Sequence, residues 1–187
     1  MVIIVICIWL FIYYRLKSNS LNTLAFIVGS FGLFTIGIFF FRDIIEEIIM
    51  KVQFRMLSLL KNIIKDLDIF YQNSSIIVKT PRIIKNILIN YECSGVIEVL
   101  VFTSILIFYP IKDFKAKTIK FVLGNFTIML ANVLRMALMI IAIKYFGDRV
   151  FDFVHLILGK LLFYIIMICM YYFTLSKFHI KKCKVVE

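Results

Sequence analysis

A cysteine, an arginine and a histidine from distant parts of the sequence are the residues best suited to covalent chemistry. Cys93 stands between Glu92 and Ser94, at the start of a long apolar run. A thiol attacks as its thiolate, and a nearby cation favours that form. His155 could take the thiol proton and later return it to a leaving amine. Arg135 could stabilise the thiolate, stabilise an oxyanion or clamp a substrate carbonyl.

Polar residues accompany this trio. Asn132 precedes Arg135 by one helical turn, so both side chains would share one helix face. Asn132 could donate a hydrogen bond to an oxyanion, or it could simply link two helices. Glu98 follows the cysteine inside the same apolar run, and it could pair with Arg135 or orient His155. The alternative without catalysis is an Arg135–Glu98 pair that holds membrane helices together.

The other cysteines lack such a neighbourhood. Cys7 and Cys169 lie within apolar runs, where a cysteine behaves as a small apolar residue. Cys183 stands in a basic tail, as a bystander or a palmitoylation site. The sequence has no CxxC pair and no spacing typical of metal ligands. We therefore expect neither a metal nor a cofactor.

The composition is that of a membrane protein. Of 187 residues, 63% are hydrophobic, well above the share in soluble globular proteins. Apolar runs recur at the length of a membrane span, roughly 20 residues. The sequence predicts an all-α polytopic membrane protein with about five transmembrane helices. We place the spans at residues 2–14, 21–41, 95–110, 121–146 and 153–175. The first is short enough to suggest a signal peptide, but no charged segment precedes it, and we expect it to be retained.

A long polar segment, residues 42–92, separates the second and third spans. Over residues 42–67, apolar positions recur at helical spacing between charged ones. This pattern predicts an amphipathic helix in the membrane interface, with a dimerisation helix as the alternative. Turn residues at 73–75 precede a β-prone run at 76–78, and residues 87–91 could pair with that run in a short β-hairpin.

Charge predicts the orientation. The chain has 22 basic and 11 acidic residues, and basic residues of membrane proteins collect in short cytoplasmic loops. No basic patch of the kind that binds nucleic acid is evident, so we expect no nucleic-acid partner. With five spans, the short basic segments share one side, which makes the segment 42–92 extracytoplasmic. Cys93, Arg135 and His155 would then meet at the extracytoplasmic end of a multi-pass protein of the plasma membrane. The basic residues on the cytoplasmic side would be Arg15, Lys17, Lys112, Lys115, Lys117, Lys120, Lys177, Lys181, Lys182 and Lys184.

These motifs carry a resemblance to a known family. The stretch Cys93-Ser94-Gly95-Val96, then Asn132-Val133-Leu134-Arg135, then His155 at the head of the last helix, resembles the exosortase/archaeosortase superfamily. The resemblance covers residues 91–175 and fits a small member. It implies a membrane cysteine transpeptidase with Cys93 as nucleophile, Arg135 as stabiliser and His155 as base. Asn132, Glu98, Ser94 and Gly95 are then expected to bind substrate or support these three.

The resemblance also implies partners. The substrates would be membrane-anchored exported proteins with a C-terminal sorting signal, which combines a short motif, a transmembrane helix and a basic end. Cys93 would cut near the outer membrane face and form a thioester, and an amine or other nucleophile, such as one carried on a lipid, would release the product.

The alternatives to an enzyme are a non-enzymatic assembly or transport subunit with a structural Arg135–Glu98 pair, and a small transporter with a buried ionisable pathway.

Overall fold

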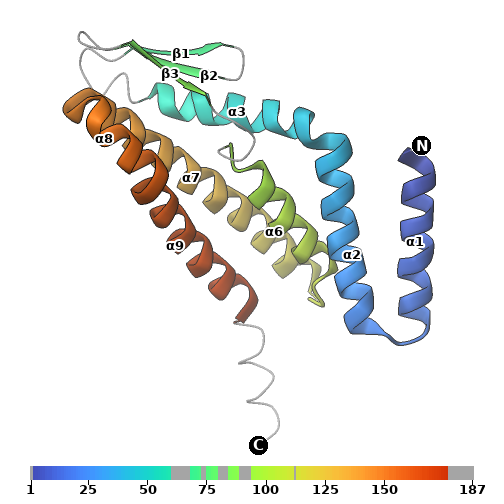
Figure 1. The fold of residues 1–187 in the computed structure, drawn as a ribbon. Helices are drawn as coiled ribbons and strands as arrows, with labels where there is room; N and C mark the ends of the chain where they lie inside the picture. The colour runs from blue at the N-terminus through green and yellow to red at the C-terminus, as the bar shows by residue number, and fades with distance from the viewer. Residues whose placement is uncertain are drawn as a thin grey trace, which may run out of the picture.

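Apolar helices in a row make up most of the molecule. The computed structural model describes residues 2–59, 68–72, 75–79, 84–88, 94–111 and 113–176. Each helix of the row contacts the next (Figure 1). A helix satisfies its own backbone hydrogen bonds, which is why apolar runs of this length adopt it in lipid. In order across the row, the helices are α1 (Val2–Ser18), α2 (Asn22–Ile36), α6 (Val96–Phe108), α7 (Phe114–Phe146) and α9 (Gly159–Tyr171).

Three helical stretches of the described chain are long and apolar enough to cross a membrane. They are Asn22–Ser58, Phe114–Phe146 and Val154–Leu175, and α6 is a shorter apolar helix. The prediction of an all-α polytopic membrane protein is therefore confirmed. The count of five spans, and the membrane boundaries given for them, stay predictions.

The stretch Asn22–Ser58 is bent rather than straight. A π-helical turn, η1 (Gly37–Phe41), follows α2, and Phe41 leaves helical geometry with φ −121° and ψ −1°. The next helix, α3 (Arg42–Ser58), turns away from α2 and runs across the ends of α6 and α7 (Figure 1). The sequence pattern predicted this helix to reach residue 67. It ends at Ser58, and residues 60–67 lie outside the described part.

Two faces of α3 are apolar. One face is buried against α6 and α7 and consists of Ile49, Met50, Gln53 and Leu57. The other carries Ile44, Ile48, Val52 and Leu59 and is exposed. A helix that covers the end of a bundle and presents a second apolar stripe suits the membrane interface.

A small antiparallel sheet follows α3. Its strands are β1 (Asp68–Gln72), β2 (Ser75–Lys79) and β3 (Ile84–Leu88), in the order β1-β2-β3. The predicted hairpin corresponds to β2 and β3, although β3 lies earlier than the predicted range 87–91. Strand β1 was not predicted. Its Ile-Phe-Tyr core is β-prone, and only two residues separate it from β2, which is typical of a hairpin.

Helix α7 is longer than the sequence suggested. We expected the residues before 121 to form a loop, but the helix begins at Phe114, where the Asp113 carboxylate accepts a hydrogen bond from the backbone N–H of Lys115 at 3.0 Å. Lys115, Lys117 and Lys120 therefore occupy its first turns. A side-chain acceptor at this position satisfies an otherwise unpaired helical N–H group, which explains the early start.

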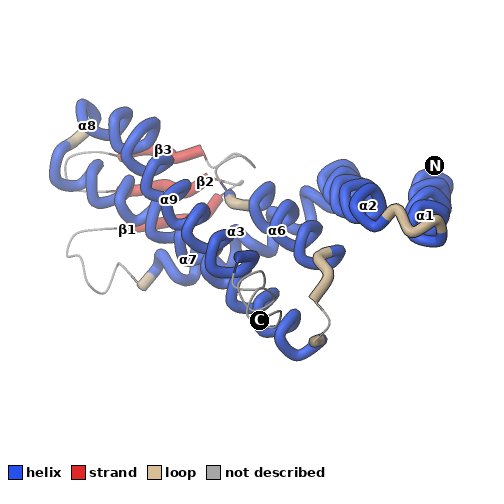
Figure 2. The backbone as a smooth tube through the Cα atoms, turned by 90° about the horizontal axis from the view of Figure 1, so that it is seen from below, coloured by secondary structure: helices blue, strands red, loops and turns tan. Residues whose placement is uncertain are grey.

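The connection after α7 is shorter than expected. The predicted link 147–152 reduces to Gly147, whose φ of 72° suits a glycine. The chain is helical again from Asp148, through α8 (Asp148–Phe153), η2 (Val154–Leu158), α9 and η3 (Tyr172–Ser176). Figure 2 shows this continuous helix beside α7.

Both main clusters of the core share α7. One cluster joins α7 to α3 and α8, and the other joins it to α6 and α9. The central members of the first are Met50, Leu57, Met136, Ile140 and Ile143. Those of the second are Phe102, Leu106, Ile128, Phe163 and Met167. Each buried section of α7 therefore packs against at least two other elements.

We expect Gly124→Leu to destabilise the bundle. A Cβ atom at Gly124 of α7 would overlap the ring of Phe102 in α6, whose side chain is buried. Overpacking of this kind costs about 1–3 kcal/mol, so the melting temperature of the detergent-solubilised protein should fall. Leu123→Ala, at an exposed neighbouring position, is the control. Adding Phe102→Leu to Gly124→Leu should restore part of the loss, and an unchanged melting temperature in Gly124→Leu would contradict this packing.

Candidate active site

The start of α6 is fixed by a buried hydrogen bond from α3. The amide Nε2 of Gln53 donates to the backbone carbonyl of Ser94 at 2.9 Å, and both residues are buried. The hydroxyl of Ser94 accepts a weaker hydrogen bond from the backbone N–H of Val96 at 3.4 Å. Cys93 lies outside the described residues. What the structure describes is that the residue directly after the cysteine is held by α3.

Gly95 places the start of α6 directly on α7. It adopts φ 82° and ψ 8°, a left-handed conformation that glycine tolerates best. A Cβ atom at this position would lie 3.4 Å from Nδ2 of Asn132, which is 0% exposed. Glycine is therefore favoured at position 95 for two reasons: the left-handed backbone conformation and the close approach of Asn132.

Arg135 lies one turn further along α7, on the same face as Asn132. Its side chain is buried, with 4% exposed. The aliphatic part passes close to Gly159 of α9, where a Cβ atom would lie 3.2 Å from Cγ of Arg135 and 3.0 Å from the carbonyl oxygen of Val154. Gly159 thus leaves the space through which the arginine side chain extends. A buried cation within a membrane helix is costly and usually marks a functional site or a structural partner.

His155 lies in η2, against the same face of α7. Its ring stacks on Phe151, with centroids 5.5 Å apart and an interplanar angle of 10°. Its Nδ1 atom lies 2.8 Å from Sδ of Met139, which follows Arg135 by one helical turn. A π-helical turn such as η2 widens the helix locally and is frequent at functional sites.

Four of the predicted site residues, Gly95, Asn132, Arg135 and His155, thus meet along one face of α7. Asn132, Arg135 and Met139 succeed one another over roughly 10 Å of helix. They contact, in turn, Gly95 at the start of α6, Gly159 of α9 and His155 of η2.

Glu98 does not join Arg135 in a direct ion pair. Both residues lie in the described part of the chain. The ion pairs between described residues are Arg42–Asp43 and Lys51–Glu47. The direct Arg135–Glu98 pair offered as the structural alternative is therefore absent.

Two contributors were not singled out from the sequence. Gln53 stands midway between Ile49 and Leu57 on the buried stripe of α3. The one feature of the sequence that could have drawn attention to it is a polar residue on an otherwise apolar helix face. Gly159 follows His155 by one turn within an apolar run, which gives no signal by itself. Among the described residues, no group of three or more His, Cys, Asp or Glu side chains could hold a metal ion.

Comparison with known proteins identifies the family. The model of the transmembrane exosortase family matches residues 1–172, including the first half of the chain that the motif resemblance did not cover. Comparisons with curated proteins and with solved structures gave no match. The match spans α3, α6, α7 and η2, the elements that build the candidate site. The chain belongs to the transmembrane exosortase family.

Proposed function

We propose that this protein is a membrane-embedded cysteine transpeptidase or protease that cleaves C-terminal sorting signals of membrane-anchored exported proteins. Family membership supports a transpeptidase-like role at the membrane. The observation that carries the proposal is the convergence of the start of α6, the Asn132–Arg135 face of α7 and His155 of η2. No metal or cofactor is required for the chemistry that these residue types support.

In the proposed reaction, Cys93 gives its thiol proton to His155, and the sulfur attacks the carbonyl carbon of the scissile peptide bond. The Arg135 guanidinium stabilises the thiolate and then the oxyanion of the tetrahedral intermediate. The Asn132 amide is placed to donate to the same oxyanion or to the substrate backbone. The C–N bond then breaks, His155 returns the proton to the leaving amine, and a thioester remains on Cys93.

The contacts of His155 favour one ring nitrogen as the base. A neutral imidazole that donates from Nδ1 toward Met139 Sδ has its lone pair on Nε2. We therefore assign proton transfer to Nε2. Stacking on Phe151 restrains the plane of the His155 ring, so that Nε2 keeps one orientation.

The second half of the reaction decides between two products. An amine, such as one carried on a lipid, would attack the thioester carbonyl and give a proton to His155. The C–S bond would then break, which releases the Cys93 thiolate and leaves a new amide bond. Water would give a free carboxylate instead. The same residues serve both outcomes, so the acceptor decides between transpeptidation and hydrolysis.

Charge supports an extracytoplasmic site in the plasma membrane. The α1–α2 and α6–α7 connections lie at the end of the bundle opposite α3 (Figure 1). That opposite end carries Arg15, Lys17, Lys115 and Lys117 in or beside helix termini. Basic residues at one end favour the cytoplasmic side for it, so we assign the α3 end to the outer face.

We expect Cys93→Ala and Cys93→Ser each to abolish processing of a co-expressed substrate that carries a C-terminal sorting signal. Loss of the nucleophile should lower the rate by at least about a thousandfold. The mobility of the substrate on a gel measures processing, and the amount of enzyme in the membrane is measured in parallel. Cys169→Ala, at an exposed position of α9, is the matched control and should process normally.

The structural alternative has its own outcome in this experiment. Full processing by Cys93→Ala, together with disappearance of the Arg135→Ala protein from the membrane, would favour a structural role for Arg135. Stable but inactive Arg135→Gln, in contrast, supports a catalytic role.

We expect a membrane-impermeant thiol reagent, added to intact cells, to label Cys93 and not Cys183. The reason is the proposed orientation, which puts the start of α6 outside and the tail inside. Cys7 and Cys169 are changed to Ser so that only two thiols remain. Mass spectrometry of the tagged peptides measures the labelling, and labelling of Cys183 alone would reverse the orientation.

We expect Gln53→Leu to slow processing roughly tenfold, because the buried Ser94 carbonyl would lose its donor, at a cost of about 1–3 kcal/mol. Lys51→Gln, on the exposed side of the same helix, is the control. The initial rate of substrate processing and the rate of Cys93 alkylation are measured together, since a displaced Cys93 should alter both. Equal rates in Gln53→Leu and Lys51→Gln would show that this hydrogen bond does not position the nucleophile.

A further inference from the structure

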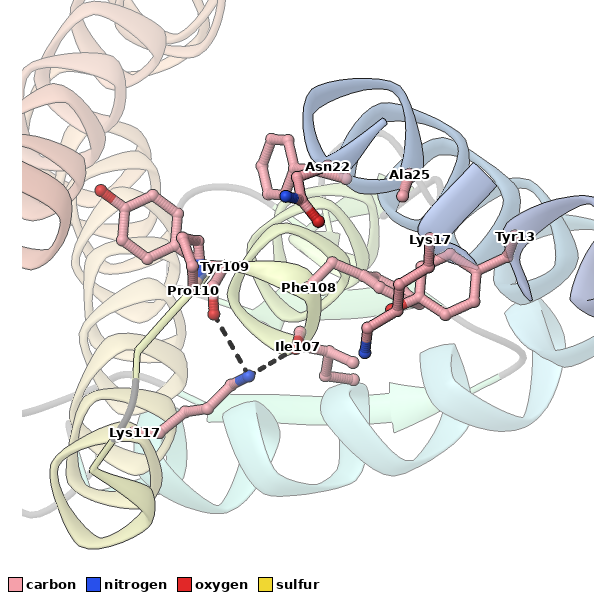
Figure 3. A pocket seen from close by; sticks show the side chains of 10 residues that line it. Tyr13, Lys17, Asn22, Ala25, Ile107, Phe108, Tyr109, Pro110 and Lys117 are labelled. Carbon is pink, nitrogen blue, oxygen red and sulfur yellow. Dashed lines mark hydrogen bonds between the residues drawn. The ribbon is translucent and has the colours of Figure 1, made fainter. Parts of the chain in front are cut away.

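A cavity of about 540 Å³ lies at the end of the bundle opposite the candidate active site (Figure 3). It is enclosed by the last turns of α1, the first turn of α2, the end of α6 and the first turn of α7. The residues that characterise it are Tyr13, Lys17, Asn22, Phe108, Tyr109 and Lys117. Nothing in the proposed reaction uses it.

The polar part of this cavity is positively charged. Figure 3 shows the ammonium groups of Lys17 and Lys117 reaching toward the end of α6 from opposite sides. The Lys117 ammonium donates to the backbone carbonyls of Ile107 and Tyr109, and with three donors it retains one. Lys17 contacts the Tyr13 ring, 5.9 Å from its centroid. No carboxylate lines the cavity, and neither lysine forms an ion pair with any described residue.

The position of the cavity suits the headgroup layer of a membrane. It lies where the ends of α1, α2, α6 and α7 meet, and tyrosines are typical of that depth. Basic pockets between membrane helices at such ends bind the phosphates of anionic lipids. A free phosphate would present the same chemistry to the two lysines.

Two further cavities lie between α2 and α6 beyond the charged cavity, and we treat them as sections of one apolar groove. A smaller neighbouring cavity shares Asn22, Phe26, Tyr109 and Pro110 with the first. The next cavity along α2, of about 350 Å³, is lined mainly by apolar side chains of Ile27, Phe31, Phe34, Val101 and Ile105.

The helical spacing makes these cavities neighbours. Ile105 and Val101 precede Tyr109 by one and two turns, so they form one stripe of α6. On α2, the lining runs from Thr23 to Phe34, over roughly 16 Å of helix, which approaches the length of a lipid acyl chain.

We propose that this site binds an anionic glycerophospholipid from the leaflet at the basic end of the bundle. Its phosphate lies between Lys17 and Lys117, and one acyl chain follows the groove between α2 and α6. The apolar cavity that lies beyond the charged one along α2 and α6 favours a lipid over a free phosphate. The proposal depends only on the membrane location of the chain and not on the proposed reaction.

The test is native mass spectrometry of the purified full-length protein in detergent, incubated with equimolar phosphatidylglycerol and phosphatidylcholine of identical acyl chains. Phosphatidylglycerol adducts should exceed phosphatidylcholine adducts by at least about tenfold. Lys17→Gln and Lys117→Gln should each lower this preference by roughly fivefold. Lys115→Gln removes the same charge from an exposed position near Lys117 that does not line the cavity, and it should leave the preference unchanged.

Two further arms separate the lipid from its alternatives. Val101→Trp should fill the groove and reduce phosphatidylglycerol adducts without altering the charge. Displacement of the lipid by inorganic phosphate or glycerol phosphate at equal concentration would overturn the lipid assignment. Equal binding of the two lipids by the unchanged protein, or an equal effect of Lys115→Gln and Lys17→Gln, would overturn the site. Lys17→Gln keeps the test decisive should Lys117→Gln fail to fold, because Lys17 contacts a ring and no backbone carbonyl among the described residues.

Discussion

The buried guanidinium of Arg135 constrains every element around it. It stands within a helix that is long and apolar enough to cross a membrane, and its side chain is almost fully enclosed. An arginine at such a depth is unfavourable in lipid, so the bundle must supply a polar enclosure. Gly159 lets α9 approach its aliphatic part, and Asn132 adds an amide one turn away. The same enclosure brings together polar groups that the proposed thiol-based reaction would use.

The shortness of α6 explains why α3 has to cover the bundle. With 13 residues, α6 is roughly 20 Å long, whereas the hydrocarbon core of a bilayer is about 30 Å thick. Its first turn, with Ser94 and Gly95 directly before it, would therefore meet an apolar environment unless another element shielded them. Backbone groups outside regular structure must find protein partners there. Gln53 of α3 supplies such a partner for the Ser94 carbonyl, which is why a polar residue occupies the buried stripe of an otherwise apolar face.

Sequence patterns predicted the helices and the residue types of the candidate site, but they did not predict the contacts between elements. Apolar runs located the helices because membrane helices must be apolar along their length. They misplaced the start of α7, since Lys115, Lys117 and Lys120 look like a loop until Asp113 is recognised as its cap. Opposite charges within two apolar runs suggested an Arg135–Glu98 pair, yet charge alone does not fix the rotation of α6 about its axis. The roles of Gln53 and Gly159 depend on which side chain lies opposite, and a single sequence does not contain that information.

The two ends of α7 stabilise the molecule by different means. With 33 residues, α7 is roughly 50 Å long, so it extends beyond the hydrocarbon core or tilts within it. At its basic end, the ammonium groups of Lys117 and Lys120 donate to the carbonyls of Ile107 and Thr174, near the C-terminal ends of α6 and of the last helix, where cations are favoured. Toward its other end, the Asn132 amide approaches the start of α6, and the Arg135 side chain passes close to Gly159 of α9. An anion bound at Lys117 would share its ammonium with the carbonyl end of α6, and the opposite end of that helix begins at Gly95, beside Asn132. Helix α6 therefore runs without interruption from the lysine end of the bundle to the residues that follow Cys93.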